Sequence, residues 1–237
     1  MTLSGIGTVR LQPYDIRPRL ERQIPSTRIR VKEPFLRRRP INTLDLSSNI
    51  IITIVGTGIA SSTGDGGPAT SATLNQPIGV YGNSIGLIYI AEDNGQRIRV
   101  VNITASSSTG SGIIQRYAGT GIQGYSGDGG TATSAQFYYP RYLAGDTASN
   151  LFIADCSNNR IRKVTYTSKI ISTYVGTGIQ SSLDNTAATS GTLNRPLGLY
   201  LVPTTKDLYI TEYNGHKTRK VSGSTGALTT IAGTGIA

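Results

Sequence analysis

The sequence predicts an all-β protein that repeats one four-stranded sheet about three times. The first observation is the composition, in which 29 Gly and 10 Pro accompany 37% of hydrophobic residues. This profile is typical of short strands joined by tight turns. The second observation is the triplet Gly-Thr-Gly, which recurs at 56–58, 119–121, 176–178 and 233–235. Other landmarks follow each triplet in the same order, so we interpret the chain as a tandem repeat.

Each copy contains four short β-rich runs. In the first copy they are Pro77–Tyr81, Leu87–Ala91, Arg97–Val101 and Ile113–Ala118. Carboxylate and small polar residues separate the second and third runs, which predicts a tight hairpin there. One sheet of this size is too small to be stable alone and must bury both faces against neighbouring sheets. Radial stacking of such sheets gives a β-propeller, in which each sheet is one blade.

The predicted propeller spans residues 49–237. Its blades cover about 77–118, 140–175 and 196–232, and a lone fourth strand is expected at 51–55. Propellers have about four blades or more, so three blades form an incomplete ring. Two interpretations stay open: the chain is a fragment of a longer propeller, or it is an arc that self-association completes.

The second copy carries the clearest form of the repeated motif, a strand ending in Ala-Asp followed by Asn-x-Arg-Ile-x-x-Val. The residues are Leu151–Asp155, Asn158, Arg160, Ile161 and Val164. This pattern resembles the NHL repeat, and the resemblance covers about residues 50–237. The other copies depart from it, with Glu92 and Glu212 in place of the aspartate. The resemblance implies a β-propeller of a family best known for binding protein, RNA or other ligands.

Residues 1–48 do not fit the repeat and are strongly basic. They hold ten Lys and Arg against four Asp and Glu, within a net charge of +10 for the whole chain. We interpret them as an Arg-rich N-terminal arm or as the remnant of a degenerate blade, since residues 28–31 echo the third-strand motif. Arg37, Arg38 and Arg39 are the residues expected to contact RNA if the arm binds nucleic acid.

The second copy breaks the repeat where the innermost strand of its blade begins. The first and third copies read Leu-Asn-Gln-Pro-Ile-Gly and Leu-Asn-Arg-Pro-Leu-Gly there, whereas the second reads Phe-Tyr-Tyr-Pro-Arg-Tyr. This stretch is expected near one mouth of the central channel, where its side chains could stack on a peptide, a sugar or a base. The alternative is that the tyrosines fill space between blades. The candidate ligand-binding residues are Tyr125, Tyr138, Tyr139, Arg141 and Tyr142.

Other recurring motifs are interpreted as structural. The glycine-rich loops at 64–67 and 127–130 each contain one aspartate, which is too few carboxylates for a typical calcium site, and we expect tight turns. One carboxylate and one base flank each predicted hairpin: Glu92 with Arg97, Asp155 with Arg160, and Glu212 with Lys217. Because these pairs recur once per blade, a structural salt bridge or a turn cap is expected.

The sequence contains no evident catalytic or metal-binding constellation. His216 is the only histidine and Cys156 the only cysteine, whereas a zinc site needs several converging ligands. We therefore expect no enzyme, no metal and no cofactor. A fragment of a propeller enzyme such as a lyase or hydrolase stays an alternative.

The leading hypothesis is a noncatalytic scaffold that binds a protein, a peptide or another ligand through one propeller face, with RNA binding as the alternative. No stretch approaches 18 uninterrupted apolar residues, so no membrane span is expected. Charged residues interrupt the first 30 positions, so no signal peptide is visible. The compartment stays undecided: cytoplasmic by default, or extracellular if the N-terminus is incomplete.

Overall fold

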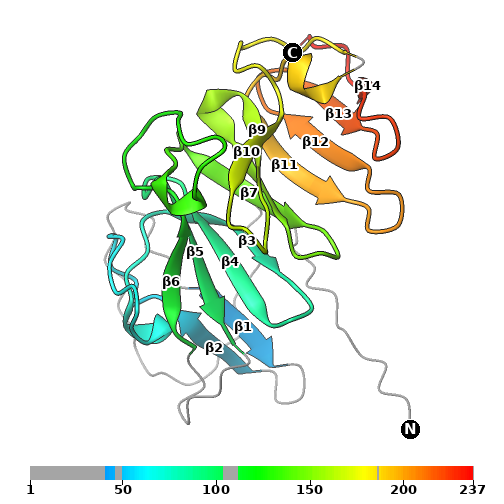
Figure 1. Cartoon of the computed structure of the whole chain (residues 1–237). Coiled ribbons are helices and arrows are strands. Elements are labelled where there is room, and N and C mark those ends of the chain that lie inside the picture. Colours follow the sequence, from blue (N-terminus) through cyan, green and yellow to red (C-terminus); the bar gives the residue numbers. More distant parts are fainter. Residues whose placement is uncertain (1–40, 46–49, 104–111, 186, 237) are drawn as a thin grey trace, which may run out of the picture. The chain divides into compact units, whose positions relative to one another are not determined.

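The computed structural model describes residues 41–45, 50–103, 112–185 and 187–236, with side chains from residue 51 onward (Figure 1). All described residues belong to one compact unit, Leu36–Ala237. Their secondary structure consists of β-strands and three-residue 3-10 helices.

Three sheets of four antiparallel strands contain twelve of the fourteen described strands. The first blade contains β3 (Pro77–Gly82), β4 (Leu87–Glu92), β5 (Arg97–Asn102) and β6 (Ile114–Ala118). The second contains β7 (Pro140–Gly145), β8 (Leu151–Asp155), β9 (Arg160–Val164) and β10 (Ile171–Val175). The third contains β11 (Pro196–Leu201), β12 (Leu208–Glu212), β13 (Lys217–Val221) and β14 (Leu228–Ala232). Strands adjacent in sequence are adjacent in each sheet, and the predicted fold class, a β-propeller of about three four-stranded blades, is confirmed.

The lone strand expected at 51–55 is in fact paired. It is β2 (Ile50–Val55), which lies antiparallel to β1 (Ile41–Asp45), inside the segment interpreted as an arm or blade remnant. Ile41 pairs with Val55 in the register in which Ile98 pairs with Ala118, so β1 and β2 correspond to the third and fourth strands of a blade. The prediction missed β1 because its sequence, Ile-Asn-Thr-Leu-Asp, lacks the basic residues that mark the third strand elsewhere.

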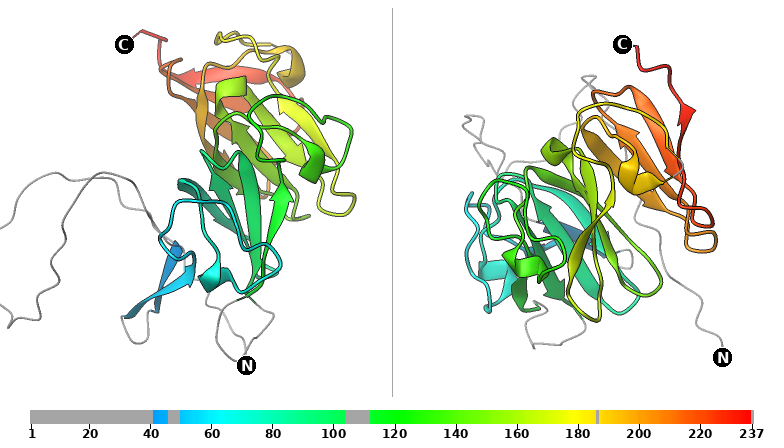
Figure 2. Two further views of the ribbon diagram at one scale, coloured as in Figure 1. Left: turned by 90° about the vertical axis from the view of Figure 1, so that its left-hand side faces the viewer. Right: turned by 45° about the horizontal axis from the view of Figure 1, so that its top comes forward.

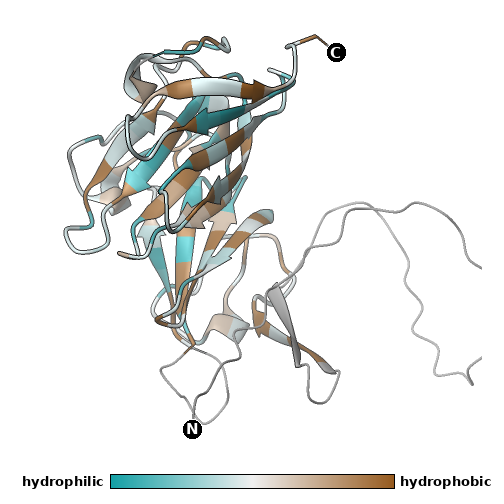
Figure 3. Ribbon diagram, turned by 90° about the vertical axis from the view of Figure 1, so that its right-hand side faces the viewer, coloured by the Kyte–Doolittle hydropathy of each residue, from teal (hydrophilic) through white to brown (hydrophobic). Residues whose placement is uncertain are grey.

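The apolar core lies between neighbouring sheets. Buried side chains of the first blade, such as Tyr89 and Ile98, pack against Leu143 and Ile153 of the second. The second and third blades meet in the same way, and a third cluster joins β2 to the first blade. The second strands β4 (Leu-Ile-Tyr-Ile-Ala-Glu) and β8 (Leu-Phe-Ile-Ala-Asp) are accordingly apolar along almost their whole length, and Figure 3 shows apolar residues in brown on the strands. The first and second blades contribute to clusters on both faces and the third to a cluster on one, so the core lies between blades and no single blade has a core of its own.

The innermost strand of each blade lies beside the innermost strand of the next. β7 contacts β3 on one side and β11 on the other (Figure 2). The approach of β3 to β7 depends on Gly79, because a Cβ at this position would overlap the carbonyl oxygen of Arg141. β3 and β7 therefore lie close together at the start of β7, where most of the predicted ligand-binding residues are also found.

Each blade contains a fully buried arginine in its third strand. A guanidinium nitrogen lies 2.6–2.7 Å from an aspartate of the loop that precedes the blade, in the pairs Arg99–Asp65, Arg162–Asp128 and Arg219–Asp184. The same arginines also meet the buried carboxylate that ends the second strand, in the pairs Arg99–Glu92, Arg162–Asp155 and Arg219–Glu212. We call each set of one arginine and two carboxylates a blade clamp. The aspartates of the predicted tight turns are therefore anchors for their loops.

The blade clamps correct the expected pairing across the hairpin. Glu92 was expected to pair with Arg97 or to cap a turn; its ion-pair partner is Arg99, two residues further along the strand, and its Oε1 accepts the Asn75 N–H. Arg97 instead donates hydrogen bonds to the backbone carbonyl oxygens of Ser62 and Thr120. The same shift applies to Asp155 and Arg160 and to Glu212 and Lys217, whose carboxylates contact the buried arginine of their own blade.

Candidate functional site

Every innermost strand is irregular directly after its proline. Regular pairing with the second strand is interrupted between Pro77 and Gly79, between Pro140 and Leu143, and between Pro196 and Leu199. A β-bulge of this kind redirects side chains and often lies next to a binding site. Aligned from the proline, the second position after it is glycine in the first and third blades and tyrosine in the second.

Tyr142 stands at this position and is 38% exposed. Other residues of the innermost strands also expose apolar side chains, namely Ile78, Val80 and Tyr200. Val80 corresponds in register to Leu143, which packs against the preceding blade, and Tyr200 corresponds to Ala144, which packs against the following one, so these two exposed side chains lie on opposite faces of their blades. The aromatic residue in the second blade is the largest departure from the repeat among them.

Arg141, the neighbour of Tyr142, is engaged in an ion pair between blades. Its Nε lies 3.0 Å from Oδ1 of Asp93, which is nearly buried at the end of the second strand of the first blade. The guanidinium therefore helps to join the first and second blades. It remains partly exposed, so one face of the group could still meet a ligand.

Tyr138 and Tyr139 form the last two residues of the loop before β7. Their rings pack on each other with centroids 4.9 Å apart, and both side chains are half-buried. Their backbone N–H groups donate to Asp155 Oδ1 and Gln96 Oε1, each at 2.8 Å. Tyr139 has a φ of 54°, a left-handed conformation that is uncommon outside glycine. The loop is thus held by both blades that flank it.

Tyr125 lies over the outer strands of the second blade. Its hydroxyl donates to Asp128 Oδ2 at 2.8 Å, and the Arg160 guanidinium carbon lies 3.8 Å from the centroid of its ring. Partial burial raises the pKa of Asp128, but hydrogen bonds from Thr173 and Tyr125 and the charge of Arg162 together hold it below its usual value. The structure therefore brings four candidate residues to the start of β7 and places Tyr125 against β9 and β10.

The residues considered for catalysis, Cys156 and His216, lie in the hairpins of two different blades. Cys156 is fully buried, and burial raises the pKa of its thiol. His216 is exposed at the hairpin of the third blade. Among the described residues, no group of three or more His, Cys, Asp and Glu side chains could hold a metal ion. Arg37, Arg38 and Arg39 lie outside the described residues, and within the described ranges no helix is long and apolar enough to cross a membrane.

Comparisons with known proteins show the fold. No family model matches the sequence, and no curated protein matches it. An auxiliary nutrient binding protein from Bacteroides thetaiotaomicron aligns with a TM-score of 0.55 and 14% identity, covering 82% of this chain and 42% of that one. A protein of unknown function from the same organism aligns with a TM-score of 0.52 and 16% identity, covering 79% and 40%.

A virginiamycin B lyase from Staphylococcus aureus also aligns, at a TM-score of 0.44 and 17% identity, covering 65% of this chain and 40% of the lyase. The chain spans less than half the length of each of these solved structures. These neighbours are propeller-like, as the three blades are.

Proposed function

We propose that this chain is a noncatalytic binding scaffold of the NHL-repeat type, and that it recognises a protein or peptide on the propeller face where β7 begins. The repeated Ala-Asp and Asn-x-Arg-Ile-x-x-Val motif supports the NHL assignment. The observation that carries the binding proposal is Tyr142, a partly exposed aromatic side chain at a position that is glycine in the other two blades.

The surroundings of Tyr142 suit a peptide. Ile78 supplies an exposed apolar side chain at the start of the adjacent innermost strand β3, and Arg141 supplies a partly exposed cation. Protein interfaces are enriched in tyrosine and arginine around an apolar centre. Tyr138 and Tyr139 have backbones held by neighbouring blades, so their rings need little ordering when a ligand binds.

The fold is compatible with this role, since one of the solved structures that shares it is an auxiliary nutrient binding protein. A shared fold does not by itself assign function, so the proposal rests on the departure from the repeat. The blade clamps obey the repeat in all three blades and are assigned to stability instead.

A peptide selection tests the proposal. A phage-displayed random peptide library would be selected on the whole chain, and the enriched peptides titrated against wild type, Tyr142→Gly and Thr229→Gly. Thr229 is an exposed residue of the outermost strand β14, so its variant makes a comparable change away from the face. We expect at least about a tenfold loss of affinity for Tyr142→Gly, as for an interface anchor, and none for Thr229→Gly. No enrichment, or equal binding by Tyr142→Gly, would overturn the proposal.

A further inference from the structure

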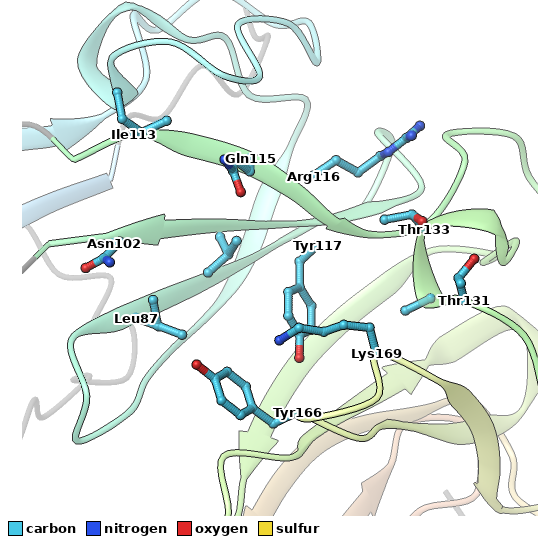
Figure 4. A pocket seen from close by; sticks show the side chains of 12 residues that line it. Leu87, Asn102, Ile113, Gln115, Arg116, Tyr117, Thr131, Thr133, Tyr166 and Lys169 are labelled. Carbon is cyan, nitrogen blue, oxygen red and sulfur yellow. The ribbon is translucent and has the colours of Figure 1, made fainter. Parts of the chain in front are cut away.

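A groove of about 550 Å³ lies between the outer parts of the first and second blades, away from the face just described (Figure 4). We call it the first inter-blade groove. Its walls include apolar side chains of the first blade, among them Leu87 and Val100, and the turn between β9 and β10 of the second. Tyr117 of β6 points into it, toward Tyr166 and Lys169 of that turn (Figure 4). The volume is within the range of small-molecule sites.

The repeat places a second, equivalent groove between the second and third blades. It measures about 300 Å³ and is lined by Tyr174, Ala188 and Gly226 among others. The equivalence follows from matching backbone hydrogen bonds: Ala132 N–H donates to the Lys169 carbonyl in one groove, and Ala188 N–H donates to the Gly226 carbonyl in the other. The groove between the second and third blades therefore serves for comparison with the first inter-blade groove, and we call it the reference groove.

The first inter-blade groove departs from this reference at the residues that give it charge. Lys169 replaces Gly226, and Arg116 of β6 replaces Thr173 of β10 at the same register position. Lys169 has a φ of 57° where Gly226 has 72°, so a lysine occupies a left-handed conformation that the repeat gives to glycine. Such a conformation is unfavourable for a residue with a Cβ, and departures of this kind cluster at functional sites.

The ammonium group of Lys169 is positioned by two aromatic rings. Its Nζ lies 3.9 Å from the centroid of the Tyr166 ring and 5.1 Å from that of Tyr117. Partial burial lowers the pKa of Lys169, so an anion at this point would restore the stability of its charged form. Among the described residues, no carboxylate forms an ion pair with Lys169.

Tyr117 supplies a nearly buried hydrogen-bond donor. Its side chain is only 8% exposed, and its hydroxyl faces only that of Tyr89, which is buried as well and has no other partner among the described residues. Burial raises the pKa of this hydroxyl, which keeps it protonated. A buried polar group of this kind costs free energy until something accepts its hydrogen bond.

We propose that the first inter-blade groove binds a small aromatic carboxylate, whose carboxyl group pairs with Lys169 and accepts a hydrogen bond from Tyr117. The apolar wall, including Leu87 and Val100, contacts the ring of the ligand. Lys169 and Tyr117 lie side by side and offer one positive charge and one hydroxyl donor, which match one carboxylate, whereas the Arg116 side chain points away from them (Figure 4). The ligand thus supplies an anion for Lys169 and an acceptor for Tyr117.

The test uses phenylacetate as the probe, with phenylacetamide as its neutral counterpart, in NMR titrations of the whole chain. We expect millimolar or tighter binding of phenylacetate, as for a fragment of this size, with the amide bound at least about tenfold more weakly. Shifts should appear at residues 115–117 and 166–169. Equal affinity for the two probes, or shifts elsewhere only, would overturn the proposal.

Three variants test whether binding depends on the residues of the groove or only on the overall positive charge of the chain. Lys169→Gly restores the residue of the reference groove and should abolish the preference for the carboxylate. Lys206→Gly is the matched control, because Lys206 is also an exposed lysine at positive φ, 60°, and should bind as wild type does. Tyr117→Phe keeps the ring and should weaken phenylacetate binding about tenfold. Unchanged binding by Lys169→Gly, or equal losses in both lysine variants, would contradict the assignment.

Discussion

Nη2 of Arg162 lies 2.6 Å from Oδ1 of Asp128, so a buried residue of β9 holds the loop through which the chain enters the second blade. The first and third blades repeat this contact at 2.7 Å. Since the loop comes from the preceding blade and the arginine from the following one, each blade clamp links a blade to the segment that leads into it. Clamps of this kind hold the long loops of a protein whose blades have no cores of their own.

Loss of the buried arginine should be far more costly than loss of the loop aspartate. Arg162→Met leaves Asp155 buried beside an apolar side chain, and breaking a buried pair in this way costs about 3–5 kcal/mol. Asp128 is 33% exposed, so Asp128→Asn should cost only about 1–2 kcal/mol. Urea unfolding followed by circular dichroism measures both, with the exposed Arg116→Met as a control near zero. Similar costs for the two variants would show that the clamp does not depend on the buried charge.

The pKa of Asp155 gives stability a distinctive dependence on pH. Burial raises this pKa to about 6, although hydrogen bonds from Tyr138 and Asn158 and the charge of Arg162 oppose the shift. Because the folded-state pKa exceeds the unfolded value, the native state binds the proton more tightly. The stabilisation is complete below about pH 4 and is lost as the pH rises through about 6. A difference of two pKa units corresponds to roughly 3 kcal/mol.

Asp155→Asn removes this titration. The unfolding free energy of the variant minus that of the wild type should therefore increase by up to ~3 kcal/mol between pH 4 and pH 7. Asp207→Asn is a control of opposite sign, because hydrogen bonds from the Gly223 N–H and from Lys220 lower the pKa of Asp207. Its difference from wild type should decrease as the pH rises toward about 4 and should stay nearly flat between pH 4 and pH 7. A flat profile for Asp155→Asn would rule out a raised pKa.

The fold was predictable because its determinants are local and repeated. Proline at the start of the first strand, a polar hairpin and a basic-x-Arg start of the third strand recur in one order, so a departure in one copy can be recognised from the others. β1 was missed because it lacks the residues that recur in the third strands of the other copies. The partner of Glu92 was also missed, because the order of residues at a hairpin does not show that Arg97 is taken by the backbone carbonyls of Ser62 and Thr120.

The candidate sites were less accessible to sequence reasoning. The aromatic residues before β7 interrupt a motif, and an interruption is visible without a structure. The first inter-blade groove instead joins Tyr117 to Lys169, which come from different blades and are unremarkable one at a time. A signal did exist, since an alignment of the copies places Lys169 on Gly226. What the alignment could not show is that both residues face one cavity.

Two glycines of β3 show whether glycine is needed for the close packing of neighbouring strands or for its backbone flexibility. A Cβ on Gly79 would overlap the Arg141 carbonyl oxygen of β7, whereas a Cβ on Gly82 would meet no atom within 4 Å. Gly79→Ala should therefore cost about 1–3 kcal/mol through displacement of the neighbouring strand. Gly82→Ala should change stability by no more than about 0.5 kcal/mol. Urea unfolding of the two variants compares them, and equal effects would mean that β3 and β7 can separate without cost.

The hairpin residue before each third strand provides the last test, because it joins one blade to the next. Gln96 accepts the Tyr139 N–H at 2.8 Å and Asn159 accepts the Arg195 N–H at 2.9 Å, whereas the same position in the third blade is the exposed His216. Gln96→Ala should cost about 1–2 kcal/mol, since it leaves a buried N–H without its acceptor. His216→Ala should stay within about 0.5 kcal/mol in urea unfolding and leave the mass in light scattering unchanged. A large cost or a smaller mass for His216→Ala would instead mean that a second copy of the chain packs against the third blade.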